Sequence, residues 1–141
     1  RASSVGALYS APACQAAIRP MPVGARDLED AASTYEYSLP EHFDLVHLGL
    51  GPDGHTASLV PDDPVLEVTD RRIAVTGTEY QGTHRMTMTY PVFEKARKIL
   101  FLVTGAEKRE ALDRLLAGDG TIPAGRVETA NATLITDIAP D

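Results

Sequence analysis

Cysteine is nearly absent from this sequence of 141 residues, where Cys14 is the only one. A single cysteine cannot form an intrachain disulfide or a cysteine-rich metal cluster, which excludes both as sources of stability. We expect Cys14 to be a small buried or half-buried apolar side chain. The histidines His42, His47 and His84 also lack the spacing of metal ligands, so we expect no metal site. His47 lies in an apolar run and is expected in the core.

Basic residues and long apolar runs are scarce as well. Lys and Arg number 13 against 20 Asp and Glu, which gives a formal net charge of −7 at pH 7. This chain lacks the positive excess with which proteins neutralise nucleic-acid phosphates, so we expect no nucleic-acid partner. It has no apolar run of about 18 residues and no signal-peptide pattern, so we expect no membrane association and a cytoplasmic location. A local basic pocket could still bind a small anion.

The rest of the composition is that of a folded domain. Hydrophobic residues make up 43% of the chain and charged residues 23%, which excludes a disordered or collagen-like polypeptide. This length has room for one domain with a real hydrophobic core, and not comfortably for two. We therefore expect residues 1–141 to form a single domain. Because the first residue is Arg and not Met, we also expect a longer parent chain.

Three segments have the pattern of helices. Residues 27–39 carry apolar side chains at helical spacing, with Asp27 as the N-cap. Residues 91–97 predict a short helix with Pro91 in its first turn. A third helix is expected at 104–118, because Thr-Gly-Ala-Glu has capping-box spacing and a glycine ends the run. The side chains expected to face inward on this third helix are Ala111, Leu112, Leu115 and Leu116.

Five further segments predict strands, namely residues 43–50, 72–76, 85–90, 99–103 and 132–138. The first and fourth are almost continuously apolar, which is typical of strands buried on both faces of a parallel sheet. In the third, alternation places Thr87 and Thr89 with Arg85 on a polar face. Strands that alternate with helices indicate an α/β fold, an open and mainly parallel sheet with flanking helices.

The loop after the first strand, GLGPDG at residues 49–54, matches the dinucleotide-binding pattern G-x-G-x-x-G. That pattern requires an acidic residue about 20 positions later, at the end of the second strand. Asp70 has the distance but precedes the strand candidate at 72–76. The carboxylate of Asp53 would also face the pyrophosphate that the loop should hold. The sequence therefore disfavours nucleotide binding.

The same loop can instead carry chemistry. His55 follows a strand and a tight turn, where ligands collect in open α/β sheets, and is expected in the first turn of a short helix. The helix dipole would disfavour a protonated imidazole there, so His55 is the candidate general base. Asp53 would orient the ring, and the nearby glycine N–H groups, for which Gly51 and Gly54 are candidates, would hold a developing oxyanion. A plain turn with a surface histidine remains the alternative.

Two cations are candidates for an anion site. Lys108 is expected in the first turn of a helix, where the dipole disfavours a cation unless an anion binds there too. Arg85 is expected on the polar face of its strand, beside another strand end. For each of them a solvated surface charge is the alternative.

These residues resemble a known family. FDLVHLGLGPDGHTASLVP (43–61) looks like the signature of the 6-phosphogluconolactonase family, and HRMTMTYPVFEKARKILFLVTGAEKREAL (84–112) resembles a later segment of it. The resemblance covers residues 27–141, and residues 1–26 loosely. It implies a Rossmann-like fold of the sugar-phosphate isomerase/lactonase type and hydrolysis of 6-phospho-D-glucono-1,5-lactone to 6-phosphogluconate. It implies no metal or organic cofactor.

The resemblance also implies roles by position. His55 would activate water, Asp53 would support it, and Lys108 and Arg85 would bind the substrate phosphate. Related glucosamine 6-phosphate isomerases/deaminases have a glutamate where this chain has Val60, which cannot transfer a proton, so the lactonase interpretation is favoured.

Family members are longer by roughly a hundred residues, the lower range of one domain. We therefore expect this chain to be the carboxy-terminal part of such a domain, without its glycine-rich phosphate loop and Asp-Glu-Arg segment. A second hypothesis is consequently a non-catalytic subunit that binds sugar phosphates.

Overall fold

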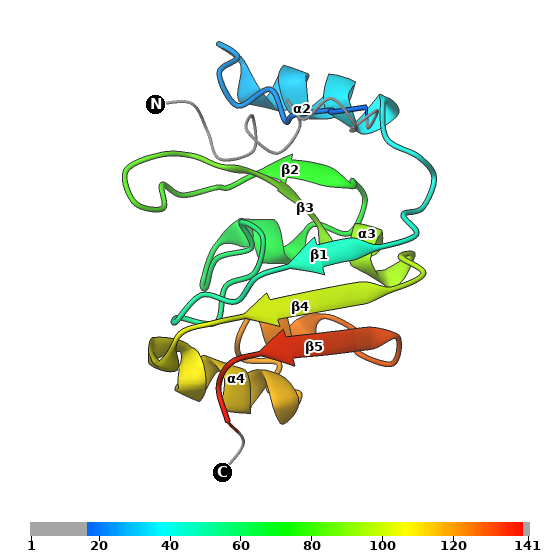
Figure 1. Cartoon of the computed structure of the whole chain (residues 1–141). Coiled ribbons are helices and arrows are strands. Elements are labelled where there is room, and N and C mark those ends of the chain that lie inside the picture. The colour runs from blue at the N-terminus through cyan, green and yellow to red at the C-terminus, as the bar shows by residue number, and fades with distance from the viewer. Residues whose placement is uncertain (1–16, 140–141) are drawn as a thin grey trace, which may run out of the picture.

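The computed structural model describes residues 17–139, so Cys14 lies outside the described residues (Figure 1). Within this range five strands form a three-stranded sheet of order β1-β4-β5 and a separate pair, β2-β3. The strands are β1 (Val46–Leu48), β2 (Ile73–Val75), β3 (Met86–Met88), β4 (Ile99–Val103) and β5 (Ala132–Thr136). The helices are α2 (Leu28–Tyr37), α3 (Tyr90–Glu94) and α4 (Arg109–Leu116), with 3-10 turns at Pro64–Glu67, Ala106–Lys108 and Ala124–Arg126.

The three-stranded sheet is parallel, which confirms the predicted α/β class. Leu48 of β1 lies opposite Phe101 of β4, which in turn lies opposite Leu134 of β5. The β2-β3 pair is antiparallel, and it packs beneath α2 (Figure 1). Because β1 and β4 run in the same direction, the loops that follow them emerge at one edge of the sheet. This edge carries the candidate site.

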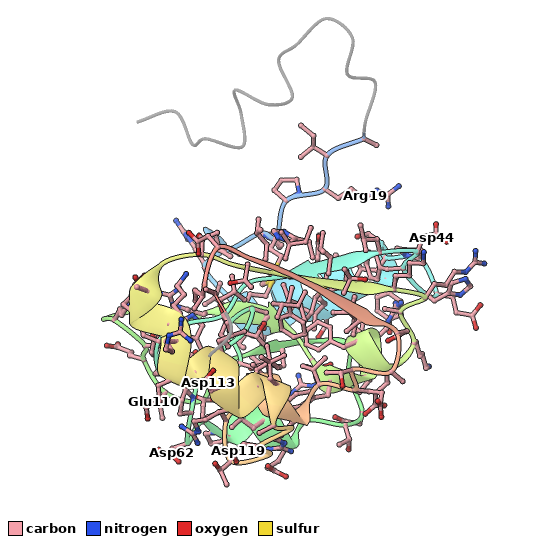
Figure 2. The ribbon with its side chains drawn as sticks, turned by 60° about the horizontal axis from the view of Figure 1, so that its bottom comes forward. Arg19, Asp44, Asp62, Glu110, Asp113 and Asp119 are labelled. Carbon is pink, nitrogen blue, oxygen red and sulfur yellow. The ribbon has the colours of Figure 1, made fainter. Side chains whose placement is uncertain are left out.

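One face of the sheet builds the core, together with α3 and α4. Phe93, Phe101 and Ile99 are almost completely buried there, and α4 contributes Leu112 and Leu115 to the same cluster. The opposite side of α4 presents Glu110 and Asp113 to solvent (Figure 2). The expectation that Leu116 faces inward is wrong, since it lies next to Leu115 at the end of the helix and is 64% exposed.

The other face of the parallel sheet is open to solvent over much of its area. His47 on β1, Leu102 on β4 and Ile135 on β5 all point to this face, and Ile135 is 53% exposed. His47 is therefore exposed, and its expected place in the core is wrong. The apolar run around it predicts burial on both faces, whereas the described elements cover only one.

The predicted capping signals hold for one helix and fail for another. Asp27 accepts hydrogen bonds from the backbone N–H groups of Glu29 and Asp30, which confirms it as the N-cap of α2. The capping box predicted for the third helix is wrong. Gly105 has a φ of +99°, and the chain makes a 3-10 turn before α4 begins, without any side-chain cap.

Among residues 17–139 no helix is both long enough and apolar enough to cross a membrane.

The predicted polar face of β3 is also wrong. Thr87 is 1% exposed and Thr89 is fully buried. Their hydroxyls are satisfied internally, because Thr87 accepts from the backbone N–H of Ser58 at 3.1 Å and Thr89 donates to the carbonyl of Arg71. Buried threonine can thus occupy a strand position that simple alternation assigns to solvent.

Candidate active site

Three loops supply the candidate site. The β1 loop (residues 49–63) and the β4 loop (residues 104–108) follow neighbouring parallel strands and so begin at one edge of the sheet (Figure 1). The β2–β3 loop (residues 76–85) joins the antiparallel pair and contacts the β1 loop through side chains. Ligands in open α/β sheets collect at this edge, so the placement agrees with the prediction from sequence.

The β1 loop is not helical around His55, contrary to expectation. Gly54 has a φ of +84° and Ala57 a φ of +52°, which are incompatible with a continuing right-handed helix. The loop is closed instead by an isolated bridge between Thr56 and Leu59 and by the Thr56 hydroxyl, which donates to the Gly49 carbonyl at 2.7 Å. A helix dipole therefore does not govern the charge of His55.

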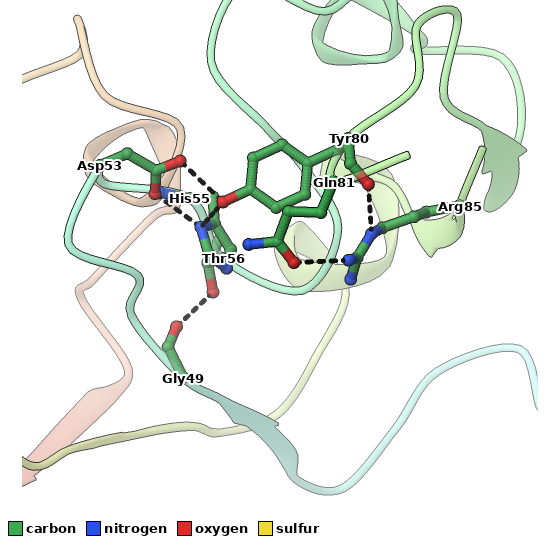
Figure 3. Close-up of polar contacts among 7 residues, drawn as sticks. All are labelled: Gly49, Asp53, His55, Thr56, Tyr80, Gln81 and Arg85. Atoms are coloured by element: carbon green, nitrogen blue, oxygen red, sulfur yellow. Dashed lines mark hydrogen bonds and ion pairs between the residues drawn. The ribbon is translucent and has the colours of Figure 1, made fainter. Parts of the chain in front are cut away.

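Asp53 and His55 form a close pair (Figure 3). Oδ1 of Asp53 lies 2.6 Å from Nδ1 of His55 and also accepts the backbone N–H of His55 at 3.1 Å. Because an ionised carboxylate only accepts hydrogen bonds, Nδ1 carries the proton and Nε2 keeps its lone pair in the neutral ring. The pair can therefore present Nε2 as a base, with Asp53 fixing the orientation of the ring.

Tyr80, in the β2–β3 loop, completes this arrangement, although it is not among the site residues predicted from the sequence. Its hydroxyl donates to Oδ2 of Asp53 at 3.0 Å and lies 3.4 Å from Nδ1 of His55. Its ring meets the imidazole edge-on, with centroids 5.4 Å apart. The only feature of the sequence that could have identified Tyr80 as a site residue is its position in a loop between two predicted strands, where its hydroxyl is free to reach another loop.

The environment shifts the pKa values of Asp53 and Tyr80 in opposite directions. Burial would raise the pKa of Asp53, but hydrogen bonds from the His55 ring and backbone, the charge of His55 and the Tyr80 hydroxyl outweigh it and lower the pKa. Burial raises the pKa of Tyr80, and so do the hydrogen bond to Asp53 and its negative charge, against the influence of Arg85. Asp53 is thus an ionised acceptor and Tyr80 a protonated donor at neutral pH.

Gly51 and Gly54, the two candidate glycines of the β1 loop, have structural roles. A Cβ atom on Gly51 would lie 2.1 Å from Nδ1 of His55, so only glycine lets the ring rest on the backbone. The N–H of Gly51 donates to the His55 carbonyl at 2.8 Å, and the N–H of Gly54 donates to the Gly51 carbonyl at 3.0 Å. Both donors are engaged within the loop, so this geometry does not offer them to an oxyanion as expected.

Arg85 lies on the side of the Tyr80 ring away from Asp53 and His55 (Figure 3). Its guanidinium carbon is 5.0 Å from the ring centroid, Nε donates to the Tyr80 carbonyl at 3.4 Å, and Nη2 donates to the Gln81 amide oxygen at 3.0 Å (Figure 3). Arg85 also lines an open cavity of about 430 Å³ together with Ser58 and His84. A cation beside a cavity can bind an anionic group there.

Lys108 ends the 3-10 turn of the β4 loop and is half-buried. Within residues 17–139, no hydrogen bond or ion pair links its ammonium to Asp53, His55 or Arg85. The structure therefore brings Asp53 and His55 together, connects them to Arg85 through Tyr80, and leaves Lys108 on the adjacent loop of the same edge. In this described range, no group of three His, Cys, Asp or Glu side chains could hold a metal ion.

Comparisons with known proteins agree with this fold. The family model for glucosamine-6-phosphate isomerases/6-phosphogluconolactonase matches residues 5–136. A 6-phosphogluconolactonase from Synechocystis sp. is 45% identical over 113 residues, which are 73% of this chain and 46% of that protein. The human 6-phosphogluconolactonase is 36% identical over 112 residues, which are 72% of this chain and 43% of its own.

Solved structures give the same picture. The 6-phosphogluconolactonase of Thermotoga maritima superposes with a TM-score of 0.65 at 32% identity, over 76% of this chain and 50% of that one. A monomeric glucosamine-6-phosphate deaminase has the same TM-score at 24% identity, which supports the fold alone. The chain spans about half the length of the curated relatives it matches. By the extent of the family match and its identity to these relatives, the chain belongs to the glucosamine-6-phosphate isomerase/6-phosphogluconolactonase family.

Proposed function

We propose that this chain supplies the catalytic base and part of the phosphate site of a 6-phosphogluconolactonase. The observation that carries the proposal is the Asp53–His55 pair, with 2.6 Å between Oδ1 and Nδ1, at the carboxyl edge of the parallel sheet. The relatives named above as 6-phosphogluconolactonases support the reaction class. The substrate is 6-phospho-D-glucono-1,5-lactone, and the product is 6-phosphogluconate.

The reaction begins at Nε2 of His55. This nitrogen takes a proton from a water molecule while the water oxygen attacks the lactone carbonyl carbon. The imidazolium that forms is stabilised by the ionised Asp53 at Nδ1. When the tetrahedral intermediate collapses, the bond between the carbonyl carbon and the ring oxygen breaks. The imidazolium then returns its proton to that oxygen, which leaves a free hydroxyl and a carboxylic acid.

Arg85 and Lys108 bind the phosphate of the substrate in this proposal. A guanidinium can grip phosphate oxygens through two parallel hydrogen bonds, whereas an ammonium acts as a point charge. Arg85 lines the cavity of about 430 Å³ and stacks on the Tyr80 ring, and Lys108 has no ion-pair partner among the residues that the structure describes. Two cations on the loops that supply the candidate site favour an anionic substrate, although the chain as a whole is acidic.

Val60 distinguishes this reaction from sugar-phosphate isomerisation. It is the position at which the sequence analysis expects a glutamate in the isomerases/deaminases, and here its side chain is apolar and 3% exposed. A buried valine can neither donate nor accept a proton during ring opening. Hydrolysis by the Asp53–His55 pair needs no group at this position.

The test is His55→Gln in the native protein, with lactone hydrolysis followed at a pH where the spontaneous reaction is slow. Loss of a general base typically costs on the order of 10²- to 10⁴-fold in kcat, which is the expected result. His42→Gln is the matched control, because His42 is an exposed histidine whose ring contacts Arg97. Unchanged turnover in His55→Gln would remove the proposed base.

A further inference from the structure

The hydroxyl of Tyr80 donates a hydrogen bond to Oδ2 of Asp53, the carboxylate oxygen that His55 does not contact. Oδ1 of Asp53 accepts both the ring and the backbone N–H of His55, whereas Oδ2 accepts only the Tyr80 hydroxyl at 3.0 Å. The Asp53 side chain is 37% exposed, so without this contact Oδ2 would face water and the carboxylate could rotate. With it, both oxygens are held (Figure 3).

We propose that Tyr80 is a positioning residue, which holds Asp53 in the orientation that keeps the proton on Nδ1 of His55 and leaves Nε2 as the base. Only the expected effect of Tyr80 on turnover rests on the proposed function. The tautomer of His55 is a property of the free protein and can be measured without substrate. Free imidazole side chains exchange between the two tautomers, so a fixed tautomer requires a partner that holds one nitrogen.

Tyr80 acts through Asp53 and does not transfer protons itself. Its hydroxyl lies 3.4 Å from Nδ1 of His55, on the ring edge opposite to Nε2, where the reacting water would bind. Burial and the neighbouring Asp53 carboxylate raise the pKa of its phenol, so it remains a donor at neutral pH. The charged and titratable side chains that face this group are Asp53, His55 and, across the Tyr80 ring, Arg85.

The same residue joins the base to the candidate phosphate-binding arginine. One end of Tyr80 holds Asp53, while its ring and its carbonyl hold the guanidinium of Arg85 at 5.0 Å and 3.4 Å. The backbone of Tyr80 is fixed by a bridge to Thr83, with an N–H to carbonyl distance of 2.9 Å. Tyr80 therefore sets the spacing between the proposed general base, His55, and Arg85, which is proposed to bind the phosphate.

The experiment is Tyr80→Phe, which removes one oxygen and keeps the ring between His55 and Arg85. The ¹⁵N chemical shifts of the His55 ring report its tautomer in the protein without substrate. In the wild type we expect Nδ1 to carry the proton almost entirely, and in the variant we expect a mixture of both tautomers. With substrate, we expect kcat to fall about tenfold while KM changes less than threefold, because the ring still supports Arg85.

Two further variants make the result decisive. Tyr35→Phe removes a comparable hydrogen bond, from the Tyr35 hydroxyl to the Arg19 carbonyl at 2.7 Å, and should change neither the tautomer nor kcat. Asp53→Asn should give the same mixed tautomer as Tyr80→Phe. A Tyr80→Phe protein with an unchanged His55 tautomer overturns the inference. If the tautomer shifts as expected but His55→Gln remains active, the positioning role stands and the proposed function fails.

Discussion

The β1 loop and the β4 loop leave the same edge of the sheet, yet they are held in different ways. The β1 loop is tied at Gly49, Gly51, Gly54 and Thr56 by hydrogen bonds within itself, and to Ala124 by the Gly54 carbonyl. The β4 loop has backbone bonds from the Lys108 N–H to the Gly105 carbonyl and from the Arg109 N–H to the Ala106 carbonyl, and it is anchored by the Gly105 N–H, which donates to Asp137 at 3.0 Å. The first loop carries the candidate base and the second carries a candidate phosphate ligand.

This difference indicates that the general base needs a more rigid loop than the phosphate ligand does. A general base must lie within a few tenths of an ångström of its working position, so its loop is fixed before the substrate arrives. A lysine that meets a phosphate needs only its charge and its reach, and its long side chain can adjust. The comparison predicts that small changes in the β1 loop reduce kcat, whereas changes in the β4 loop act on KM.

The largest effect is expected for Gly51→Ala. The added Cβ would lie 2.1 Å from Nδ1 of His55 and 2.7 Å from Oδ1 of Asp53, so the pair must separate. Displacement of a catalytic group by about 1 Å costs on the order of 100-fold, and we expect at least that loss in kcat. Lactone hydrolysis at saturating substrate measures it.

Gly49→Ala is the matched control in the same loop, because no atom lies within 4 Å of the Cβ it would add. It should retain nearly full kcat, and both variants should show the cooperative unfolding of the parent. Equal losses in the two variants would mean that the loop does not depend on close packing of the ring against Gly51.

The next effect is expected for Lys108→Met, which removes the charge and keeps most of the side chain's length. A charge-assisted hydrogen bond contributes about 1.5–3 kcal/mol, so KM for the phosphorylated lactone should rise on the order of 10- to 100-fold. We expect kcat to change less than threefold, because the base lies on the other loop. Steady-state kinetics gives KM and kcat separately. The same measurement with a lactone that lacks the phosphate shows whether the effect on KM depends on that group.

Lys95→Met provides the control, since Lys95 is an exposed lysine just beyond α3. Its KM should equal that of the parent. A Lys108→Met protein that loses kcat at unchanged KM would break the comparison, since the β4 loop would then take part in the chemical step.

The parts of this molecule that were predicted correctly depend on neighbours in sequence. The continuous apolar run at Ile99–Val103 marks β4, and Asp27 marks the start of α2, because both signals are local. The proximity of Asp53 to His55 could be expected for the same reason, since two residues within one turn have few ways to avoid each other. Their catalytic roles stay a prediction.

What could not be predicted depends on contacts between distant segments. Tyr80 reaches Asp53 across 27 positions, and only the path of the β2–β3 loop brings the two together. The burial of Thr87 likewise depends on the backbone of Ser58, 29 positions away. The exposure of His47 depends on which elements cover the sheet, and the pattern of one strand cannot report this.

The smallest effect on turnover, and a clear one on stability, is expected at the anchors of the two loops. Asp63 ends the β1 loop, is 3% exposed, and accepts four hydrogen bonds, from the N–H groups of Val65, Gly77 and Thr78 and from the Thr78 hydroxyl. Asp137, the anchor of the β4 loop, is exposed and accepts a hydrogen bond from the Gly105 N–H. Burial would raise the pKa of Asp63, but the Thr78 hydroxyl and the three N–H groups outweigh it and lower the pKa.

A carboxyl whose pKa is lower in the folded state stabilises the protein above its unfolded pKa, near pH 4, and loses this contribution as the pH falls through the folded value. Asp63→Asn should therefore cost about 1–3 kcal/mol at neutral pH, where an amide meets three N–H groups. Its stability should fall less than the parent's as the pH drops below about 4. Asp137→Asn should stay within about 0.5 kcal/mol of the parent, since it is a surface substitution. Urea unfolding at a series of pH values measures both. If the Asp63→Asn protein lost stability in acid as steeply as the parent, the β1 loop would not owe its firm support to this buried carboxylate.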